Sequence, residues 1–424
     1  MKRSPSAFRG IRLGAMVTVP PRRILLGDAD AFFVAVARLS DPDGLGREPL
    51  LIVGGSRESR GVVCSASYET RRFGVRSAMP ISQALRLCPN AVCVPVPRRA
   101  CGELSRAIRA VLEQYAPVVE GASIDEWYLD LGGTEALYRQ EPLAATATRI
   151  RQAVREATQL SVSFGGGTSK LIAKLAVEHA KPRGGTGGNG VHVVPAGWEA
   201  AFMRGVKLAE IPGVGPRFQE RLAALGMHTV PDVLQYDERT LATYLGSNAA
   251  EWLLRKARGE DDSSVEPRLE NKQISRDETF SLDLGTDQEL ERELLALVVR
   301  VATDLRGDGL AARTVTVRLR DRDFRTRQAG RTLDRPIVTE RAIFQVARVL
   351  LRRLRGARRV PARLVGVALS SLSHDPEADQ LTLFEERSDA TPETARDRSL
   401  ARAVDTVRAR FGDDILVPGA IRDR

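Results

Sequence analysis

A short apolar run that leads directly into acidic residues is the feature that most constrains this chain. Ile24–Leu26 predicts a buried strand, and Gly27-Asp28-Ala29-Asp30 follows it at once. Carboxylates this close to a buried strand are costly unless they are paired, hydrated or bound to a metal ion. The run therefore predicts a sheet with an acidic edge.

A second group of acids follows a predicted hairpin. Val118–Glu120 and Ile124–Leu131 favour two strands joined through Gly121-Ala122-Ser123, which places Asp125 and Glu126 just past the turn. If this hairpin neighbours the first strand, three carboxylates converge, and hard ions such as Mg²⁺ prefer such oxygen ligands. Two such ions about 4 Å apart can activate a hydroxyl and stabilise a leaving pyrophosphate. The alternative is strand-end acids that face water, and spacing alone does not separate the two.

The order of elements favours an α+β protein. Several connections between predicted strands are too short for a repeated βαβ pattern. Residues 205–258 predict short helices, and residues 259–271 predict a polar, acidic linker. Residues 272–372 then show the order βαββαβ, which is the split-βαβ arrangement, and a late helix is expected near Arg402 to Arg410.

Composition excludes several classes of protein. The chain has 424 residues, 43% of them hydrophobic, and four cysteines without CxxC spacing. A disulfide scaffold is excluded and a structural zinc site is disfavoured. No apolar run approaches the ~20 residues that span a bilayer, and none forms a signal-peptide core. We expect a cytoplasmic protein without a membrane anchor, with residues 1–22 as a basic, disordered extension.

The positive charge is concentrated in one segment. The formal net charge of the chain is +10, but residues 305–365 alone hold 17 Arg, no Lys and five acids, a net charge of +12. Within them, Val315, Val317 and Leu319 alternate with polar and basic residues, so one strand face can pack while the other meets phosphates. Such contacts are independent of base sequence and sensitive to salt. A solvated sheet face is the alternative.

Four segments resemble, in order and approximate spacing, the motifs of the Y family of DNA polymerases, which are the translesion enzymes. The resemblance covers about residues 22–415 and is closest to the DNA polymerase IV (DinB) branch. Leu26–Phe33 and Ser123–Glu126 resemble the two acidic motifs. The fingers motif is resembled by Tyr68–Val75 with Met79-Pro80. The palm lysine motif is resembled by Ser169–Lys174 through Lys181-Pro182.

This resemblance implies an α+β right-hand polymerase with a ferredoxin-like palm, small fingers, a helical thumb and a βαββαβ little-finger domain. The implied domains are the extension 1–22, the palm 23–31 and 98–186, the fingers 32–97, the thumb 187–258 with a helix-hairpin-helix, the linker 259–271, the little finger 272–373, and a tail 374–424.

The resemblance also implies roles for residues of the active site. The carboxylates of Asp28, Asp125 and Glu126, with the backbone carbonyl of Ala29, would hold two Mg²⁺ ions. The nucleotide would be bound by Phe32, Phe33, Tyr68, Arg71 and Lys170, with Phe33 as a steric gate against the ribose 2′-hydroxyl. Arg presents a rigid fork to phosphate and Lys a point charge, which suits this role.

Further segments are expected to hold DNA and a partner protein. The implied DNA contacts are Gly213 and Gly215, whose backbone N–H groups can approach a phosphate, and Arg313, Arg318 and Arg320. Within the tail, Gln380, Leu381, Leu383 and Phe384 resemble the pentapeptide that binds the bacterial sliding clamp (beta subunit); a tail folded back on its own domain is the alternative.

The implied function is template-dependent DNA synthesis by two-metal phosphoryl transfer. The chain would be a monomeric DNA-directed DNA polymerase acting on primer–template DNA and deoxynucleoside triphosphates, in low-fidelity translesion synthesis without proofreading. Three positions depart from the family pattern, Ala37, Trp127 and Ser169. Trp127 and Ser169 keep open a non-catalytic adaptor that binds DNA and the clamp; a metal-dependent nuclease explains less of the sequence.

Overall fold

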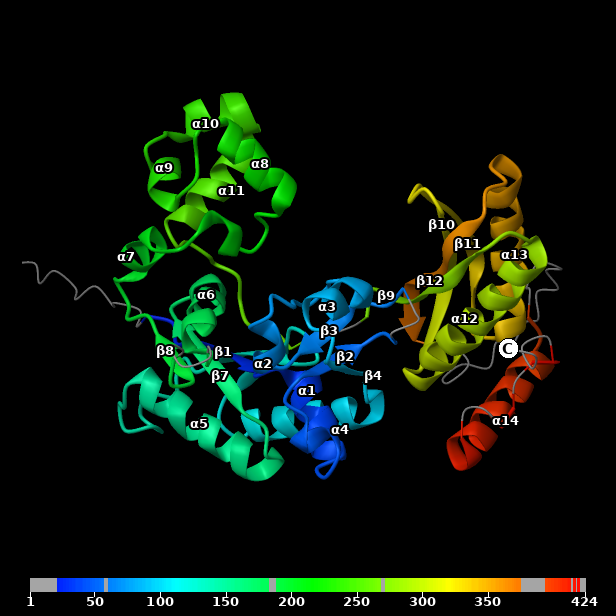
Figure 1. Cartoon of the computed structure of the whole chain (residues 1–424), viewed down its shortest axis with the longest axis horizontal. Helices are drawn as coiled ribbons and strands as arrows, with labels where there is room; N and C mark the ends of the chain where they lie inside the picture. Colours follow the sequence, from blue (N-terminus) through cyan, green and yellow to red (C-terminus); the bar gives the residue numbers. More distant parts are fainter. Residues whose placement is uncertain are drawn as a thin grey trace, which may run out of the picture. The chain divides into compact units, whose positions relative to one another are not determined.

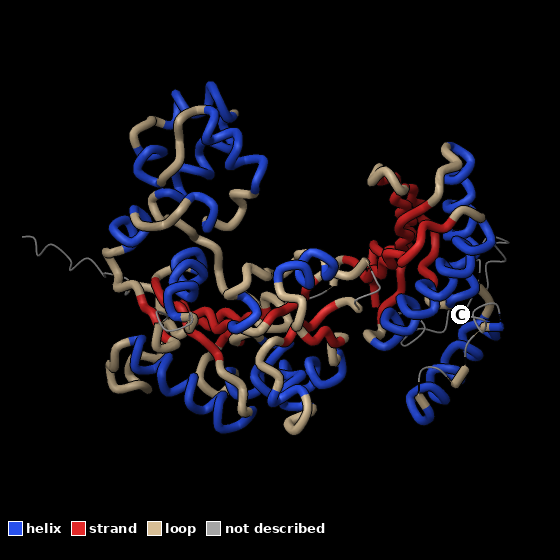
Figure 2. The backbone as a smooth tube through the Cα atoms, in the orientation of Figure 1, coloured by secondary structure: helices blue, strands red, loops and turns tan. Residues whose placement is uncertain are grey.

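The structure is a computed structural model, and it describes residues 21–56, 60–182, 188–267, 271–374, 393–412, 415–416 and 418–419. The chain divides into two compact units, each of which mixes helices and strands (Figures 1 and 2). The first unit is Met1–Pro49, Ser67–Glu69 and Pro97–Arg268; the second is Leu50–Ala66, Thr70–Val96 and Leu269–Arg424. Residues 1–20 of the predicted extension and the predicted clamp motif lie outside the described residues.

A five-stranded sheet forms the centre of the first unit, in the order β5-β6-β1-β7-β8. β1 is antiparallel to both β6 and β7, and its register places Asp28 opposite Glu126 on one side and Ser163 on the other. The predicted hairpin is therefore a neighbour of the first strand. The strands are β1 (Ile24–Ala29), β5 (Val118–Gly121), β6 (Glu126–Asp130), β7 (Val162–Gly167) and β8 (Val191–Val193).

Helix α6 (Lys170–Ala180) packs directly on β7 because glycine leaves room for it. A Cβ atom at Gly165 would lie 2.2 Å from the carbonyl oxygen of Ala173, so any side chain there would push the helix away. Ile24 and Leu26 pack against α6, while α5 lies on the other side of the sheet (Figure 1). The remaining elements around this sheet are α1 (Phe32–Ser40), η1 (Leu45–Arg47), α4 (Arg98–Leu112) and α5 (Leu143–Thr158).

The rest of the first unit is helical, as predicted for residues 205–258. Its helices share one apolar core with Leu171, Ile172 and Leu175 of α6. The elements are α7 (Glu199–Arg204), η2 (Leu208–Glu210), α8 (Pro216–Ala224), α9 (Val230–Leu234), α10 (Glu238–Leu245) and α11 (Ser247–Ala257).

The second unit contains two sheets. The smaller has the order β3-β2-β4 and packs with α3. Its elements are β2 (Leu51–Gly54), β3 (Val63–Ala66), α3 (Ile81–Leu87) and β4 (Val92–Val94); α2 (Tyr68–Arg71) spans the boundary between the two units.

The larger sheet of the second unit has the order β11-β10-β12-β9, and α12 and α13 cover one face of it. This confirms the predicted βαββαβ order. In β10, Val315, Val317 and Leu319 are fully buried while their neighbours are partly exposed, which confirms the alternation. The elements are β9 (Gln273–Leu284), α12 (Asp287–Gly307), β10 (Leu310–Asp321), β11 (Thr326–Ile337), α13 (Glu340–Ala357) and β12 (Ala362–His374).

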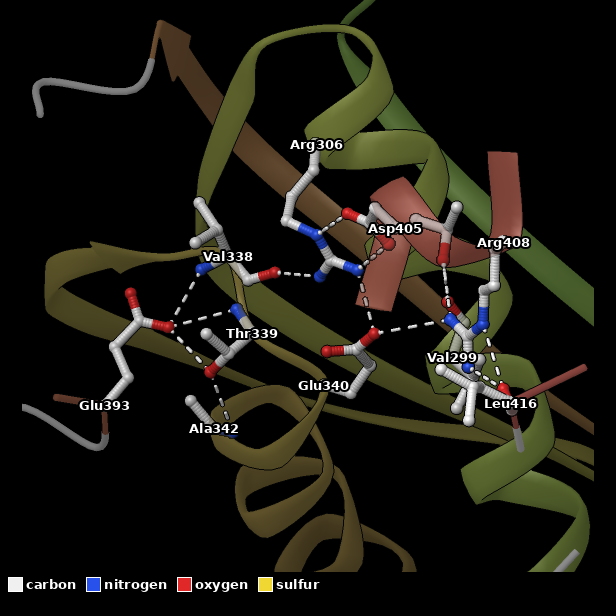
Figure 3. Close-up of polar contacts among 11 residues, drawn as sticks. Val299, Arg306, Val338, Thr339, Glu340, Ala342, Glu393, Asp405, Arg408 and Leu416 are labelled. Atoms are coloured by element: carbon white, nitrogen blue, oxygen red, sulfur yellow. Dashed lines mark hydrogen bonds and ion pairs between the residues drawn. The ribbon is translucent and has the colours of Figure 1, made fainter. Parts of the chain in front are cut away.

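The late helix is longer than predicted and is anchored to this domain. α14 (Ala395–Phe411) is preceded by Glu393, whose carboxylate accepts the backbone N–H groups of Val338 at 3.1 Å and Thr339 at 3.0 Å. Arg306 of α12 donates two hydrogen bonds to Asp405, at 2.6 and 2.8 Å (Figure 3). The tail helix is thus held by α12 and by the start of α13.

No helix among the described residues is long and apolar enough to span a bilayer.

Candidate active site

The structure brings two of the three predicted acids together where β1 and β6 meet. Asp28 lies near the end of β1 with only 7% of its surface exposed, and Glu126 begins β6 directly opposite. The backbone N–H of Ala29 donates to the carbonyl of Asp125 at 2.9 Å, which fixes the loop before β6. Asp28 and Glu126 therefore form a carboxylate pair at the edge of a buried sheet.

The third acid has a local partner. The carboxylate of Asp125 accepts a hydrogen bond from the hydroxyl of Ser123 at 2.5 Å, within its own turn. Over the part of the chain that the structure describes, no three Asp, Glu, His or Cys side chains are gathered in a way that could hold a metal ion. The carboxyl oxygens suit Mg²⁺ chemically, but Asp125 is not gathered with Asp28 and Glu126 into a set of three among the described residues.

Two lysines pair with the acids, and neither was named among the predicted site residues. The Nζ atom of Lys181 lies 2.8 Å from the carboxylate of Asp28 and 2.8 Å from that of Glu178, and Lys174 pairs with Glu126. The spacing from 170 to 174 to 181 places three lysines along one side of α6 and its C-terminal end. That spacing was the signal available in the sequence. In the structure, the packing of α6 on β7 then brings Lys174 and Lys181 to the acids.

The local electrostatics favour a cation beside these acids. Burial raises the pKa of Asp28 to about 7, although the charge of Lys181 acts against this rise. Burial also opposes ionisation of Glu126, but the hydrogen bond and charge of Lys174 lower its pKa overall. A buried carboxylate stays ionised where a positive charge or hydrogen-bond donors compensate for lost hydration. The pair is therefore a site at which a cation is stabilising.

Lys170, which the resemblance assigned to the nucleotide, has a different neighbour. Its Nζ atom donates to both carboxylate oxygens of Glu120 at 2.7 Å and lies 4.6 Å from the centre of the Tyr128 ring. Because β5 supplies Glu120, Lys170 fastens the start of α6 to this strand.

Two of the three departures from the family pattern have a structural explanation. Ser169 caps α6, because its hydroxyl accepts the backbone N–H of Ile172 at 3.3 Å. Trp127 is 2% exposed, and strand alternation directs it to the face opposite Glu126. Ala37 is buried in α1. None of the three removes an acid or a lysine from the site.

The candidate nucleotide residues lie on α1 and α2. Phe32 is buried and Phe33 is partly exposed at the start of α1, and their rings meet edge to face with centres 5.5 Å apart. Tyr68 begins α2 in the first unit. Arg71 ends α2 in the second unit, where its Nε donates to the carbonyl of Ala66 at 2.9 Å.

The candidate DNA-binding glycines occupy an exposed turn before α8. Gly213 has φ of 99°, which favours glycine. A Cβ atom at Gly213 would also lie 2.6 Å from the ring of Trp252, so both the backbone and the packing require glycine here. Gly215 precedes α8, and a Cβ atom at Gly215 would meet nothing within 4 Å. The N-terminus of a nine-residue helix is therefore open to an approaching anion.

The candidate arginines of β10 each have a polar neighbour. Arg313 donates to the carbonyl of Leu333 at 3.2 Å, Arg318 pairs with Asp277 at 2.8 Å, and Arg320 donates to Thr326 at 2.8 Å. Arg313 is exposed and the other two are partly exposed, on the face opposite the apolar core.

The chain is similar to known proteins over most of its length. Residues 27–178 match the impB/mucB/samB family, and residues 271–383 match the C-terminal domain of that family. The chain is 36% identical over 396 residues to the DNA polymerase IV of Desulfatibacillum aliphaticivorans, covering 93% of this chain and 95% of that protein. It is also 36% identical over 393 residues to the DNA polymerase IV of Caulobacter vibrioides, covering 92% of each.

Solved structures extend the comparison to the fold. A Y-family DNA polymerase chimera of Dbh and Dpo4 matches with a TM-score of 0.73 and 25% identity, over 83% of this chain and all of that one. DinB from Sulfolobus solfataricus matches with a TM-score of 0.55 and 27% identity, over 82% and 98%.

These matches confirm the α+β polymerase fold and the function that the motifs predicted. The chain belongs to the Y family of DNA polymerases, in its DNA polymerase IV (DinB) branch, and is a DNA-directed DNA polymerase of translesion synthesis.

Proposed function

We propose that Asp28, Asp125 and Glu126, with the backbone carbonyl of Ala29, hold two Mg²⁺ ions during nucleotide addition. The family is generally metal dependent, and the observation that carries the finer assignment is the Asp28–Glu126 pair, each acid matched by one lysine. The ions held by these residues would supply activation of the primer 3′-hydroxyl and stabilisation of charge on the leaving pyrophosphate. The carboxylate oxygen of Asp125 that does not accept from Ser123 would remain available to a metal ion.

Lys174 and Lys181 have a proposed role in binding the triphosphate. With metal ions bound at Asp28 and Glu126, Lys174 would lose its pair with Glu126, and Lys181 would lose Asp28 while retaining its pair with Glu178. Their ammonium groups then bind phosphate oxygens, for which a lysine on a flexible stem is suited. Tyr68, Arg71 and Lys170 remain the proposed additional contacts, and Lys170 would exchange Glu120 for phosphate in the same way.

Phe33 is the proposed steric gate, with Phe32 as the buried support beneath it. The ring of Phe33 is partly exposed, and the edge of one ring rests against the face of the other. A ring held beneath the sugar would clash with a ribose 2′-hydroxyl and select deoxynucleotides.

DNA is proposed to bind at Gly213, Gly215, Arg313, Arg318 and Arg320. The open helix N-terminus and the exposed arginines both suit phosphate rather than bases. Arg318 would exchange Asp277 for a phosphate oxygen. This gives the sequence-independent grip that a polymerase needs.

The sliding clamp (beta subunit) is the proposed protein partner of a monomeric enzyme, through Gln380, Leu381, Leu383 and Phe384. This rests on the sequence pattern alone. Replacing Leu383 and Phe384 by Ala is expected to abolish stimulation of synthesis by the clamp; an equal loss of synthesis without the clamp would contradict a docking role.

The domain boundaries also stay as proposed from the sequence. We assign the palm to 23–31 and 98–186, the fingers to 32–97, the thumb to 187–258, the linker to 259–271, the little finger to 272–373 and the tail to 374–424.

Primer extension with Mg²⁺ and four deoxynucleotides tests the proposed catalytic acids. Asp28→Asn and Glu126→Gln keep side-chain shape but remove charge, and each is expected to lower the extension rate by at least about a thousandfold. Asp130→Asn is the matched control, because Asp130 lies at the other end of β6 and its carboxylate accepts the local backbone N–H of Gly132. Extension by Glu126→Gln at the rate of Asp130→Asn would refute the assignment, and DNA binding without extension by the wild type would favour the adaptor.

A further inference from the structure

Asp30 makes a set of hydrogen bonds that the proposed metal site does not use. Its backbone N–H donates to the carbonyl of Ser161 at 2.9 Å. Its carboxylate accepts the hydroxyls of Ser161 and Ser163, each at 2.8 Å. Asp30 is 9% exposed and Ser163 is fully buried. The residue is thus fixed to β7 and to the segment before it by three hydrogen bonds.

The hydroxyl of Ser161 is itself held in place. Arg151 of α5 donates to it at 3.1 Å, so Ser161 accepts from Arg151 and donates to Asp30. Because one hydroxyl carries one proton, this direction is set by the guanidinium, which can only donate. The orientation of the Asp30 carboxylate is therefore determined by α5 as well as by β7.

The residue after Asp30 has a strained backbone. Ala31 has φ of 47° and ψ of 45°, the left-handed conformation, in which the Cβ atom of a non-glycine residue is crowded. Such strain persists only where the surroundings over-determine it. Its carbonyl accepts the N–H groups of Val34 at 2.9 Å and Ala35 at 3.0 Å, which begins helix α1. Ala31 is therefore a strained joint between the anchored Asp30 and the helix that carries Phe33.

We infer that Asp30 is a positioning residue for sugar selection, and that it acts through Phe33. The three hydrogen bonds of Asp30 hold one side of the left-handed turn, and the first turn of α1 holds the other. Without the anchor, Ala31 relaxes toward an unstrained conformation and α1 shifts, so that Phe33, two residues on, leaves its place. Asp30 itself touches neither sugar nor phosphate. This inference rests on the proposed steric gate.

The quantity to measure is kcat/KM for ribonucleotide incorporation divided by kcat/KM for deoxynucleotide incorporation. Phe33→Ala is the reference and is expected to raise this ratio the most. Asp30→Ala is expected to raise it about tenfold, the effect of losing one charge-assisted hydrogen-bonding group. Ser163→Ala removes one of the two hydroxyls and is expected to raise it less. Loss of structure alone would lower both reactions together and leave the ratio unchanged.

Two further variants separate positioning from other roles. Asp30→Asn retains one acceptor oxygen, and its amide group can donate to the second hydroxyl, so we expect a ratio near that of the wild type. If Asp30 served as a charged catalytic group, this variant would be as defective as Asp30→Ala. Adding Ala31→Gly to Asp30→Ala removes the backbone strain and is expected to restore part of the selectivity.

The outcomes distinguish the two proposals. If Phe33→Ala raises the ratio while Asp30→Ala and Ser163→Ala do not, the steric gate stands and the positioning role is refuted. If Phe33→Ala leaves the ratio unchanged, both are refuted. Should Asp30→Ala fail to fold, as judged by circular dichroism, Ser163→Ala in comparison with the wild type decides the matter, because an unchanged ratio there overturns the role.

Discussion

Two regions of the molecule contain partly buried ion pairs, and they differ in how many partners each charged group has. The lysine–carboxylate cluster consists of Asp28, Glu126, Lys174 and Lys181 in the first unit. The tail network consists of Arg306, Glu340, Glu393, Asp405 and Arg408 in the second unit (Figure 3). In the first, each acid pairs with one lysine; in the second, Arg306, Glu340, Glu393 and Arg408 each have several partners, and Asp405 accepts two hydrogen bonds from Arg306.

The difference lies in how completely each charge is satisfied. Glu393 accepts two backbone N–H groups and the hydroxyl of Thr339, and pairs with Arg398 at 2.7 Å. Arg306 binds Asp405 through two hydrogen bonds and Glu340 through a third. A planar guanidinium matched at several atoms is fixed, whereas an ammonium on a flexible stem exchanges partners readily. We infer that the arginine pairs stabilise the fold, and we propose that the lysine pairs give way to ligands.

Breaking the tail network is expected to have the largest effect on stability. Glu393→Ala removes the acceptor for Val338 and Thr339, and we expect the second unit to lose about 3 kcal/mol of unfolding free energy, the cost of breaking a buried pair. Hydrogen exchange at these two amides, followed with urea unfolding, measures this loss. Arg341→Ala is the control, because the exposed guanidinium of Arg341 pairs with Asp397 at the surface and such pairs contribute little to stability. Equal effects of the two variants would contradict the comparison.

Breaking the lysine–carboxylate cluster should affect activity more than stability. Lys181→Met retains much of the side-chain length but removes the charge beside Asp28. We expect kcat/KM for deoxynucleotides to fall about a hundredfold, which corresponds to about 2.7 kcal/mol of transition-state stabilisation. Steady-state single-nucleotide insertion measures this, with the exposed Lys272→Met as the control. A loss of stability as large as that of Glu393→Ala would mean that this pair also builds the fold.

Arg318 tests whether exposure, and not only the kind of cation, decides which pairs exchange, because it is an arginine whose pair is exposed. Its pair with Asp277 is expected to exchange for DNA phosphate, like the lysines. Arg318→Gln should lower the slope of log affinity against log salt by about 1 and leave unfolding almost unchanged. Fluorescence anisotropy on primer–template DNA over a range of salt measures the slope. An unchanged slope would place Arg318 outside the DNA contacts.

The sequence was sufficient where a feature is local or periodic. An apolar run that ends in acids predicted Asp28 at the end of a buried strand, and a period of two predicted the faces of β10. Both depend on neighbours in the chain, so both are visible without the fold.

The sequence was insufficient where partners are distant. Glu393 and Val338 are 55 residues apart, and Arg306 and Asp405 are 99 residues apart, so no local pattern indicates either pair. The match of Lys181 to Asp28 depends on the packing of α6 over Gly165. The hydrogen bond from Ser123 to Asp125 is local, but it engages one oxygen of the carboxylate for which the motif implied a metal role.

Metal ions are proposed to replace Lys181 and Lys174 as the partners of Asp28 and Glu126. Electron paramagnetic resonance of Mn²⁺, added to the full chain with primer–template DNA and a non-hydrolysable deoxynucleotide, counts the bound ions directly. We predict two ions per chain for the wild type and for Asp130→Asn, and fewer for Asp28→Asn and for Glu126→Gln. Two ions in all four proteins would contradict the claim.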